Sequence, residues 1–171
     1  MFRNILVATD GSALSDLAVS QAVELAAALH ARLVVMTASE PFHLLTTEAE
    51  QIADTEDEYR IHMQHRADRI LGAAAEKAAS HGVETATVHV DSDHPHEAII
   101  ATATGEHCDL IVMASHGRRG FSALVLGSET TKVLTHSTIP VLVVRAEGMP
   151  AQPVTAAGHA FPGAAFSARR D

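Results

Sequence analysis

Four short runs of uninterrupted aliphatic residues constrain the fold of this chain most. They lie at residues 5–8, 33–36, 110–114 and 141–144, and each has the length of one β-strand. Strands that are apolar at every position are typical of a parallel sheet covered on both faces. A fifth segment, residues 84–91, alternates apolar and polar residues, which indicates a half-exposed strand at an edge of the sheet.

Helical segments separate these predicted strands. Ser12 can cap a helix over residues 12–30, whose inward stripe is predicted to be Leu14, Leu17, Ala18, Ala22, Leu25 and Leu29. Three further helices are predicted: 54–81, ended by a left-handed Gly82, then 95–105 and 128–136. Four strand–helix units closed by a fifth strand, joined by right-handed crossovers, predict an α/β three-layer sandwich with a five-stranded parallel sheet.

Composition and charge limit the domain organisation and the partners. A chain of 171 residues with 47% hydrophobic content suits one domain over residues 1–145, followed by a flexible Ala-, Gly- and Pro-rich tail at 146–171. The formal charge of −9 argues against nucleic-acid or membrane partners, which require excess Lys and Arg. No long apolar span or signal-peptide pattern is present, so a cytoplasmic location is expected. The single cysteine, Cys108, is expected to be a small buried residue.

A glycine-punctuated loop over residues 113–130 joins the fourth strand to the last helix. Such loops at a helix N-terminus hold phosphate in α/β proteins. Gly117 and Gly127 are backbone-permissive points in this loop, and the Ser128 hydroxyl could cap the following helix or bind a phosphate oxygen. After the first strand, Asp10 could accept hydrogen bonds from a ribose hydroxyl or an adenine amino group.

Three motifs in order resemble the universal stress protein family: ILVATDGS at the start, MASHG followed by nine residues and GS, and the closing IPVLVVR. The resemblance covers residues 1–145 and implies the strand order 3-2-1-4-5. It also implies a stress-response regulatory protein that binds ATP or another adenine nucleotide, with or without Mg²⁺, between strands 1 and 4. The residues carried over are Ala8, Thr9, Asp10 and Thr37 at the nucleoside end, and Met113, Ala114, Gly117, Arg118, Gly127, Ser128 and Thr130 toward ribose and phosphate.

One position departs from the family's pattern, which has a glycine where this chain has Ala114. At the end of a strand Ala114 should be extended and unstrained, although its methyl group could obstruct a ligand. Ala114 therefore supports one alternative, a dimeric interaction module without nucleotide. A slow ATPase is a separate alternative that does not depend on this position. The loop could be an ordinary connection, and Asp10 could cap the first helix together with Ser12. No catalytic residue is assigned.

Other polar residues have plainer interpretations. His116 has no positioned partner in the sequence, and the twelve histidines are expected to be scattered over the surface rather than to hold a metal. Glu129 and Lys132 are expected on a solvated helix face. The last strand would expose an aliphatic edge, which favours a homodimer through Val141, Leu142, Val143 and Val144, and the family resemblance implies the same interface.

Overall fold

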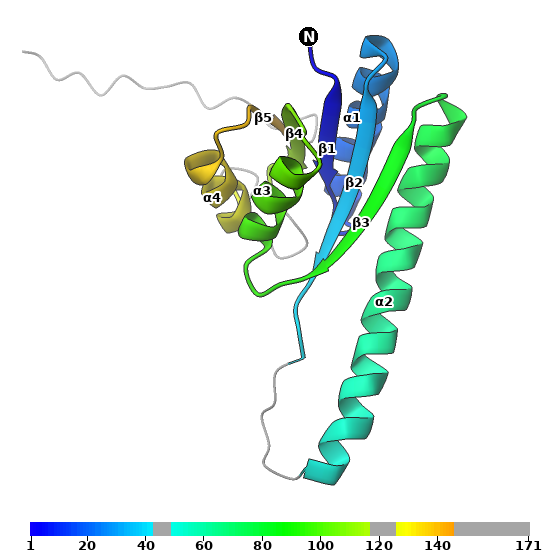
Figure 1. The fold of residues 1–171 in the computed structure, drawn as a ribbon, viewed down its shortest axis with the longest axis vertical. Helices are drawn as coiled ribbons and strands as arrows, with labels where there is room; N and C mark the ends of the chain where they lie inside the picture. The colour runs from blue at the N-terminus through cyan, green and yellow to red at the C-terminus, as the bar shows by residue number, and fades with distance from the viewer. Residues whose placement is uncertain (43–48, 117–125, 146–171) are drawn as a thin grey trace, which may run out of the picture.

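The computed structural model of the protein describes residues 1–42, 49–116 and 126–145, with side chains described in these ranges except at 49–55. Five parallel strands form one sheet in the order β3-β2-β1-β4-β5, which confirms the predicted fold class and strand order (Figure 1). The elements in chain order are β1 (Asn4–Ala8), α1 (Ala13–Leu29), β2 (Arg32–Ser39), α2 (Ala49–Ser80), β3 (Thr85–Asp91), α3 (Pro95–Gly105), β4 (Leu110–Ala114), α4 (Ser128–His136) and β5 (Val141–Val144).

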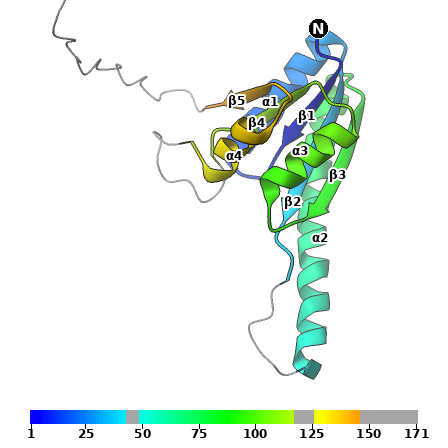
Figure 2. The ribbon, with the colours of Figure 1, turned by 60° about the vertical axis from the view of Figure 1, so that its left-hand side comes forward.

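Helices cover both faces of the sheet, as the fully apolar strands predict. Alternate residues of β1 serve the two faces: Ile5 and Val7 pack in the cluster under α1 and α2, and Leu6 packs in the cluster under α3. All three side chains have no exposed surface. Figure 2 shows α3 and α4 in front of the sheet, with α1 and α2 behind it. The predicted edge strand is confirmed as well, because β3 ends the sheet order.

Two helix ends follow the predicted capping chemistry, the start of α1 and the end of α2. The Ser12 hydroxyl accepts a hydrogen bond from the Ser15 amide at 3.2 Å, and α1 ends at His30 in the left-handed conformation. Gly82 has a φ of +69°, as predicted for the end of α2. The start of α2 differs, because the helix begins at Ala49 rather than at residue 54. Its first residues have good helix propensity but no apolar periodicity, so a prediction based on periodicity starts too late.

The inward stripe of α1 was predicted partly wrongly, because Leu17 is 47% exposed. The residues that face the core are Ser15, Ala18, Val19, Ala22, Val23 and Ala26. These side chains are mostly small, which allows α1 to lie close to the sheet. The larger leucines at positions 14, 25 and 29 are half-buried at the margin of the core. Packing distance, rather than hydrophobicity alone, therefore decides which stripe faces inward.

Two further predictions concern residues away from the site. Cys108 is buried, as predicted, and burial raises the pKa of its thiol to about 11. Within the described ranges, no helix combines the length and hydropathy needed to span a bilayer. The predicted tail at 146–171 lies outside the described residues.

Candidate functional site

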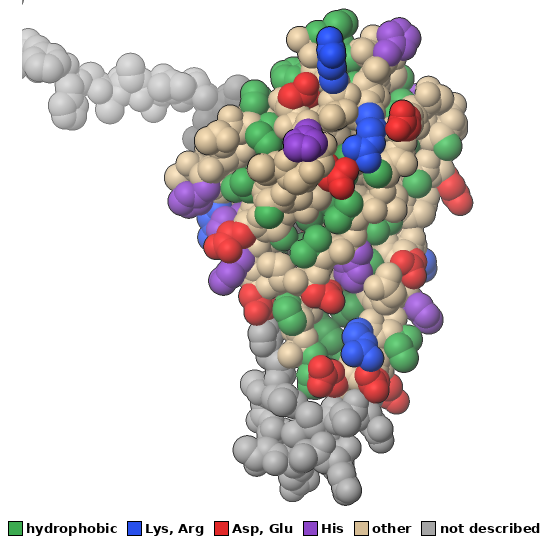
Figure 3. Space-filling model, viewed as in Figure 1, with side chains coloured by type: hydrophobic (Ala, Val, Ile, Leu, Met, Phe, Trp, Pro, Cys, Tyr) green, Lys and Arg blue, Asp and Glu red, His purple; other side chains and the backbone are tan. Residues whose placement is uncertain are grey.

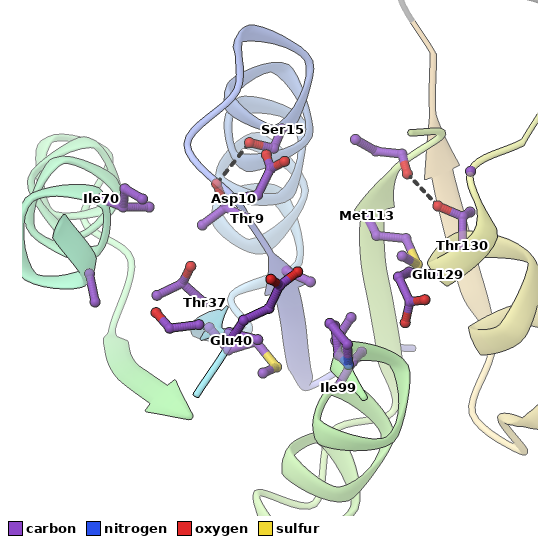
Figure 4. Close-up of a pocket in the computed structure, with 18 of the residues that line it drawn as sticks. Thr9, Asp10, Ser15, Thr37, Glu40, Ile70, Ile99, Met113, Glu129 and Thr130 are labelled. Atoms are coloured by element: carbon purple, nitrogen blue, oxygen red, sulfur yellow. Dashed lines mark hydrogen bonds between the residues drawn. The ribbon is translucent and has the colours of Figure 1, made fainter. Parts of the chain in front are cut away.

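The connections that leave β1 and β4 turn to opposite faces of the sheet. The chain passes from β1 to α1 on one face and from β4 to α4 on the other, although the two strands are paired neighbours. Such a switch point opens a crevice beyond the carboxyl ends of the strands. A cavity of about 700 Å³ lies there, bounded by residues from both connections (Figure 4). This volume is in the range of small-molecule sites.

All predicted site residues that the structure describes line this cavity. Gly117 and Arg118 lie outside the described residues. The predicted residues that the fold brings together are Ala8, Thr9, Asp10, Thr37, Met113, Ala114, Gly127, Ser128 and Thr130. They come from four segments of the chain that end at one edge of the sheet.

Hydrogen bonds hold the loop after β1 in place. The Thr9 hydroxyl lies 2.9 Å from the Ser15 hydroxyl and accepts the Gly11 amide at 3.2 Å. The Asp10 carboxylate accepts the Ser12 amide at 3.0 Å, and Arg66 of α2 donates to the Asp10 carbonyl oxygen at 3.0 Å. Asp10 therefore supports the turn into α1 and also lines the cavity. Both interpretations of this residue from the sequence are compatible with its position.

The opposite wall is formed where β4 ends and α4 begins. Ala114 is the last residue of β4 and is extended, as predicted, and its carbonyl oxygen accepts the Thr130 hydroxyl at 3.0 Å. Gly127 has a φ of −60°, so its conformation does not require glycine. A Cβ atom there would lie 3.1 Å from the Cα of His116, so the close approach of these two segments explains the missing side chain.

The predicted capping role of Ser128 is wrong. The N-cap of α4 is Gly127, which contributes no side-chain hydrogen bond, and Ser128 is the first residue of the helix. A capping hydroxyl must precede the first helical residue in order to reach the amides of the first turn. Ser128 is instead one of the residues that line the cavity.

The wall that α2 provides was not predicted from the sequence. This helix extends beyond the carboxyl edge of the sheet (Figure 1). Five of its residues line the cavity. The hydroxyl of Tyr59 donates to the carbonyl oxygen of Glu40 at 2.9 Å, which ties α2 to the end of β2. The sequence showed the helical spacing of the apolar residues in this helix. It did not show which of these residues lie beyond the edge of the sheet. The lining residues from α2 are Tyr59, Met63, Arg66, Ala67 and Ile70.

Other lining residues come from segments that were expected to be core or surface. Met36 and Ile99 join the predicted site residue Met113 in an apolar part of the cavity wall. Figure 4 shows Ile99 and Met113 there. Such a wall is suited to a flat, apolar ring system. The remaining lining residues outside α2 that were not predicted are Ser15, Ala38, Ser39, Glu40, Asp93, Pro95, His116 and Glu129.

The prediction of a solvated helix face holds for Lys132, whose side chain is 46% exposed, but Glu129 is only partly exposed. Its side chain is 33% exposed, and Oε1 accepts the Lys132 ammonium at 2.8 Å. Oε2 accepts the backbone amide of His96 at 3.0 Å, and Nδ1 of His96 lies 3.0 Å from the same oxygen. Burial raises the pKa of Glu129, but the hydrogen bonds from Lys132 and His96 outweigh burial and hold that pKa below its ordinary value.

His96 likewise departs from the predicted surface position, since its side chain is 12% exposed. Its ring centroid lies 6.2 Å from that of His94 and 6.1 Å from that of His136. Among the residues that the structure describes, no group of three or more His, Cys, Asp and Glu side chains is arranged to hold a metal ion. The hydrogen bonds to Glu129 account for the position of His96.

The described lining is rich in carboxylates. Asp10, Glu40, Asp93 and Glu129 face the cavity together with Arg66. On the face of the molecule in Figure 3, acidic and histidine side chains are interspersed with apolar ones, and the described Lys and Arg residues form no broad patch. Within the described lining, Arg66 is the only Lys or Arg residue beside these four carboxylates.

Comparisons with known proteins agree on one family. The sequence model of the Universal stress protein family matches residues 1–145. Universal stress protein YxiE of Bacillus subtilis (strain 168) is 36% identical over 149 residues, which cover 85% of this chain and 100% of the relative. The solved structure of hypothetical protein MJ0577 superposes with a TM-score of 0.70 at 24% identity, covering 86% of this chain and 98% of that one. A universal stress protein solved in complex with cAMP has a TM-score of 0.60 at 26% identity, covering 84% and 97%. The chain belongs to the universal stress protein family.

Proposed function

We propose that this protein is a stress-response regulator that binds an adenine nucleotide in the cavity between β1 and β4. The observation that carries the proposal is the convergence of the two predicted groups, the loop after β1 and the start of α4, on one cavity of about 700 Å³. The relative solved with cAMP supports the same class of ligand.

The lining offers a distinct environment for each part of a nucleotide. Met36, Ile99 and Met113 provide apolar surface for a base, and Asp10 provides an acceptor for a ribose hydroxyl or an amino group. The first amides of α4 would meet the phosphate, and the family's pattern assigns Gly117 and Arg118 to the same group. Each hydrogen bond to a charged oxygen stabilises the complex by about 1.5–3 kcal/mol.

A cavity-filling substitution tests the proposal. Ala38 lines the cavity at the end of β2, and replacing it with tryptophan should fill the space for the base. We expect Ala38→Trp to weaken binding of AMP, cAMP and ATP at least about tenfold, because the overlap cannot be relieved without moving the sheet. Isothermal titration calorimetry with and without Mg²⁺ measures the affinities.

The same substitution at Ala28 is the matched control, because Ala28 is an exposed residue of α1 away from the cavity. Ala28→Trp should leave all affinities unchanged. If the wild-type protein takes up no adenine nucleotide at millimolar concentration, the proposal is wrong.

A second candidate function is a dimeric interaction module without nucleotide. Ala114 favours it, since this methyl-bearing residue lines the cavity where the family's pattern has glycine. The methyl group of Ala114 takes space from a ligand without disturbing the fold, because Ala114 is extended and buried within β4. The titration of the wild-type protein distinguishes the two candidates.

We also propose a homodimer that forms through β5. This strand ends the sheet order next to β4, and its Leu142 is 40% exposed. An aliphatic strand edge is a surface that readily pairs with a second copy. We expect Val143→Lys to give a monomer in analytical ultracentrifugation, because burying an ammonium group at the interface is costly.

Leu134→Lys is the control for the dimer. Leu134 is 43% exposed and lies on α4 rather than on β5. The Leu134→Lys variant should therefore have the same sedimentation coefficient as the wild type. A dimer that persists in Val143→Lys would place the interface elsewhere.

A further inference from the structure

The N-termini of α3 and α4 meet at one side of the cavity, and a single carboxylate joins them. The N-caps of both helices, His94 and Gly127, make no side-chain capping hydrogen bond. Glu129, in the first turn of α4, accepts the amide of His96 in the first turn of α3 at 3.0 Å. Figure 4 shows its carboxylate directed from α4 toward the α3 side of the cavity, where Ile99 lies.

This carboxylate occupies the position that would otherwise attract an external anion. The first turns of two helices carry partial positive charge, and the Lys132 ammonium lies 2.8 Å from Oε1 of Glu129. Although burial raises the pKa of Glu129, the hydrogen bonds from Lys132 and His96 hold that pKa below its ordinary value, so the group is ionised at neutral pH. The Lys132 ammonium and the backbone amide of His96 are therefore already paired with the protein's own negative charge.

We propose that Glu129 is a specificity-determining residue that makes the cavity select nucleotides with one phosphate, free or cyclic, over nucleoside di- and triphosphates. The inference rests on the proposed function and deepens it. Each added phosphate brings further negative charge at neutral pH. Like charges separated by a partly buried cavity repel one another more strongly than they would in bulk water.

The test is a titration series in which only the charge of the ligand changes. Adenosine, cAMP, AMP, ADP and ATP are titrated by calorimetry at low, fixed ionic strength with EDTA present. The wild type should bind AMP more tightly than ATP. In Glu129→Gln, the ratio of the ATP to the AMP dissociation constant should fall about tenfold, because one negative charge is removed from the wall. The affinity for adenosine should not change.

Two further variants separate charge from structure. Lys132→Gln removes the cation beside Glu129 and should raise the ratio of the ATP to the AMP dissociation constant, because one positive charge is lost from the same wall. Glu97→Gln removes one negative charge from the first turn of α3, where the side chain is 68% exposed and does not line the cavity. The ratio of the ATP to the AMP dissociation constant in Glu97→Gln should match that of the wild type. The melting temperature of each variant without ligand reports whether it is folded.

The outcomes distinguish the inference from the proposed function. The role of Glu129 is overturned if the ratio of the ATP to the AMP dissociation constant is the same in Glu129→Gln as in the wild type. It is also overturned if this ratio changes by the same factor in Glu97→Gln. In both cases nucleotide binding itself stands. A wild-type protein that binds ATP more tightly than AMP without divalent cations overturns the role of Glu129 as well. If neither adenosine nor any nucleotide binds to the wild type, the proposed function is wrong and the inference falls with it.

Discussion

Replacement of Gly11 with alanine should lower the free energy of unfolding by about 2–3 kcal/mol, because two effects act at this position. Gly11 has a φ of +74°, a conformation that strains a residue with a side chain. A Cβ atom there would also lie 2.9 Å from the Cδ1 and Cγ1 atoms of Ile70 on α2. These atoms belong to a flexible side chain that can shift, so most of the loss should come from the backbone. Denaturant unfolding measures the change.

Gly72 provides a matched control with the opposite expected sign. It lies on an exposed face of α2, where an added Cβ atom would meet no atom within 4 Å. Gly72→Ala should therefore raise the free energy of unfolding by about 0.5–1 kcal/mol through helix propensity. Introducing Gly11→Ala into an Ile70→Ala protein separates the two effects. The loss of unfolding free energy that remains there is due to the positive φ, and the difference from the loss in the wild-type background is the steric contribution of Ile70. Equal effects at Gly11 and Gly72 would contradict this explanation.

Replacement of Leu6 with alanine should destabilise the protein by about 3–5 kcal/mol. Leu6 lies in β1 between β2 and β4, has 0% exposure and packs in the cluster under α3. The strands around it are held by the sheet's hydrogen bonds, so the space left by the missing atoms cannot close completely. Thermal and denaturant unfolding should both report the loss.

The control is the same substitution at Leu134, which is 43% exposed on α4. Leu134→Ala should change the free energy of unfolding by less than about 1 kcal/mol, because alanine is a good helix former and little apolar surface is lost. A loss below about 1 kcal/mol in Leu6→Ala would mean that this core can rearrange around a cavity.

Several elements could be predicted because their signals are local. The uninterrupted aliphatic runs identified β1 and β4, and Gly82 marked the end of α2 in its left-handed conformation. Ala114 was predicted to be extended from its place at the end of a strand, and it is. Such signals depend on residues a few positions apart, which interact in the same way wherever the segment lies in the fold.

Other predictions failed where distant segments meet. Leu17 has the right spacing for a core residue, yet the alanines of α1 face the sheet because they allow the helix to lie closer. From the sequence, Glu129 was expected to be a solvated helix residue. In the structure it accepts a hydrogen bond from the backbone amide of His96, 33 residues away. Neither helix carries a local sign of this contact.

Local sequence patterns were enough to predict the succession of strands and helices, and the motifs indicated the family, from which the strand order was expected. Tertiary structure alone decided that α2 forms a wall of the cavity and that Glu129 joins the first turns of α3 and α4. The physical reason is the range of the forces involved. Backbone propensity and apolar periodicity act between near neighbours, whereas a cavity and its charges exist only after crossover connections bring separate segments to one edge of the sheet.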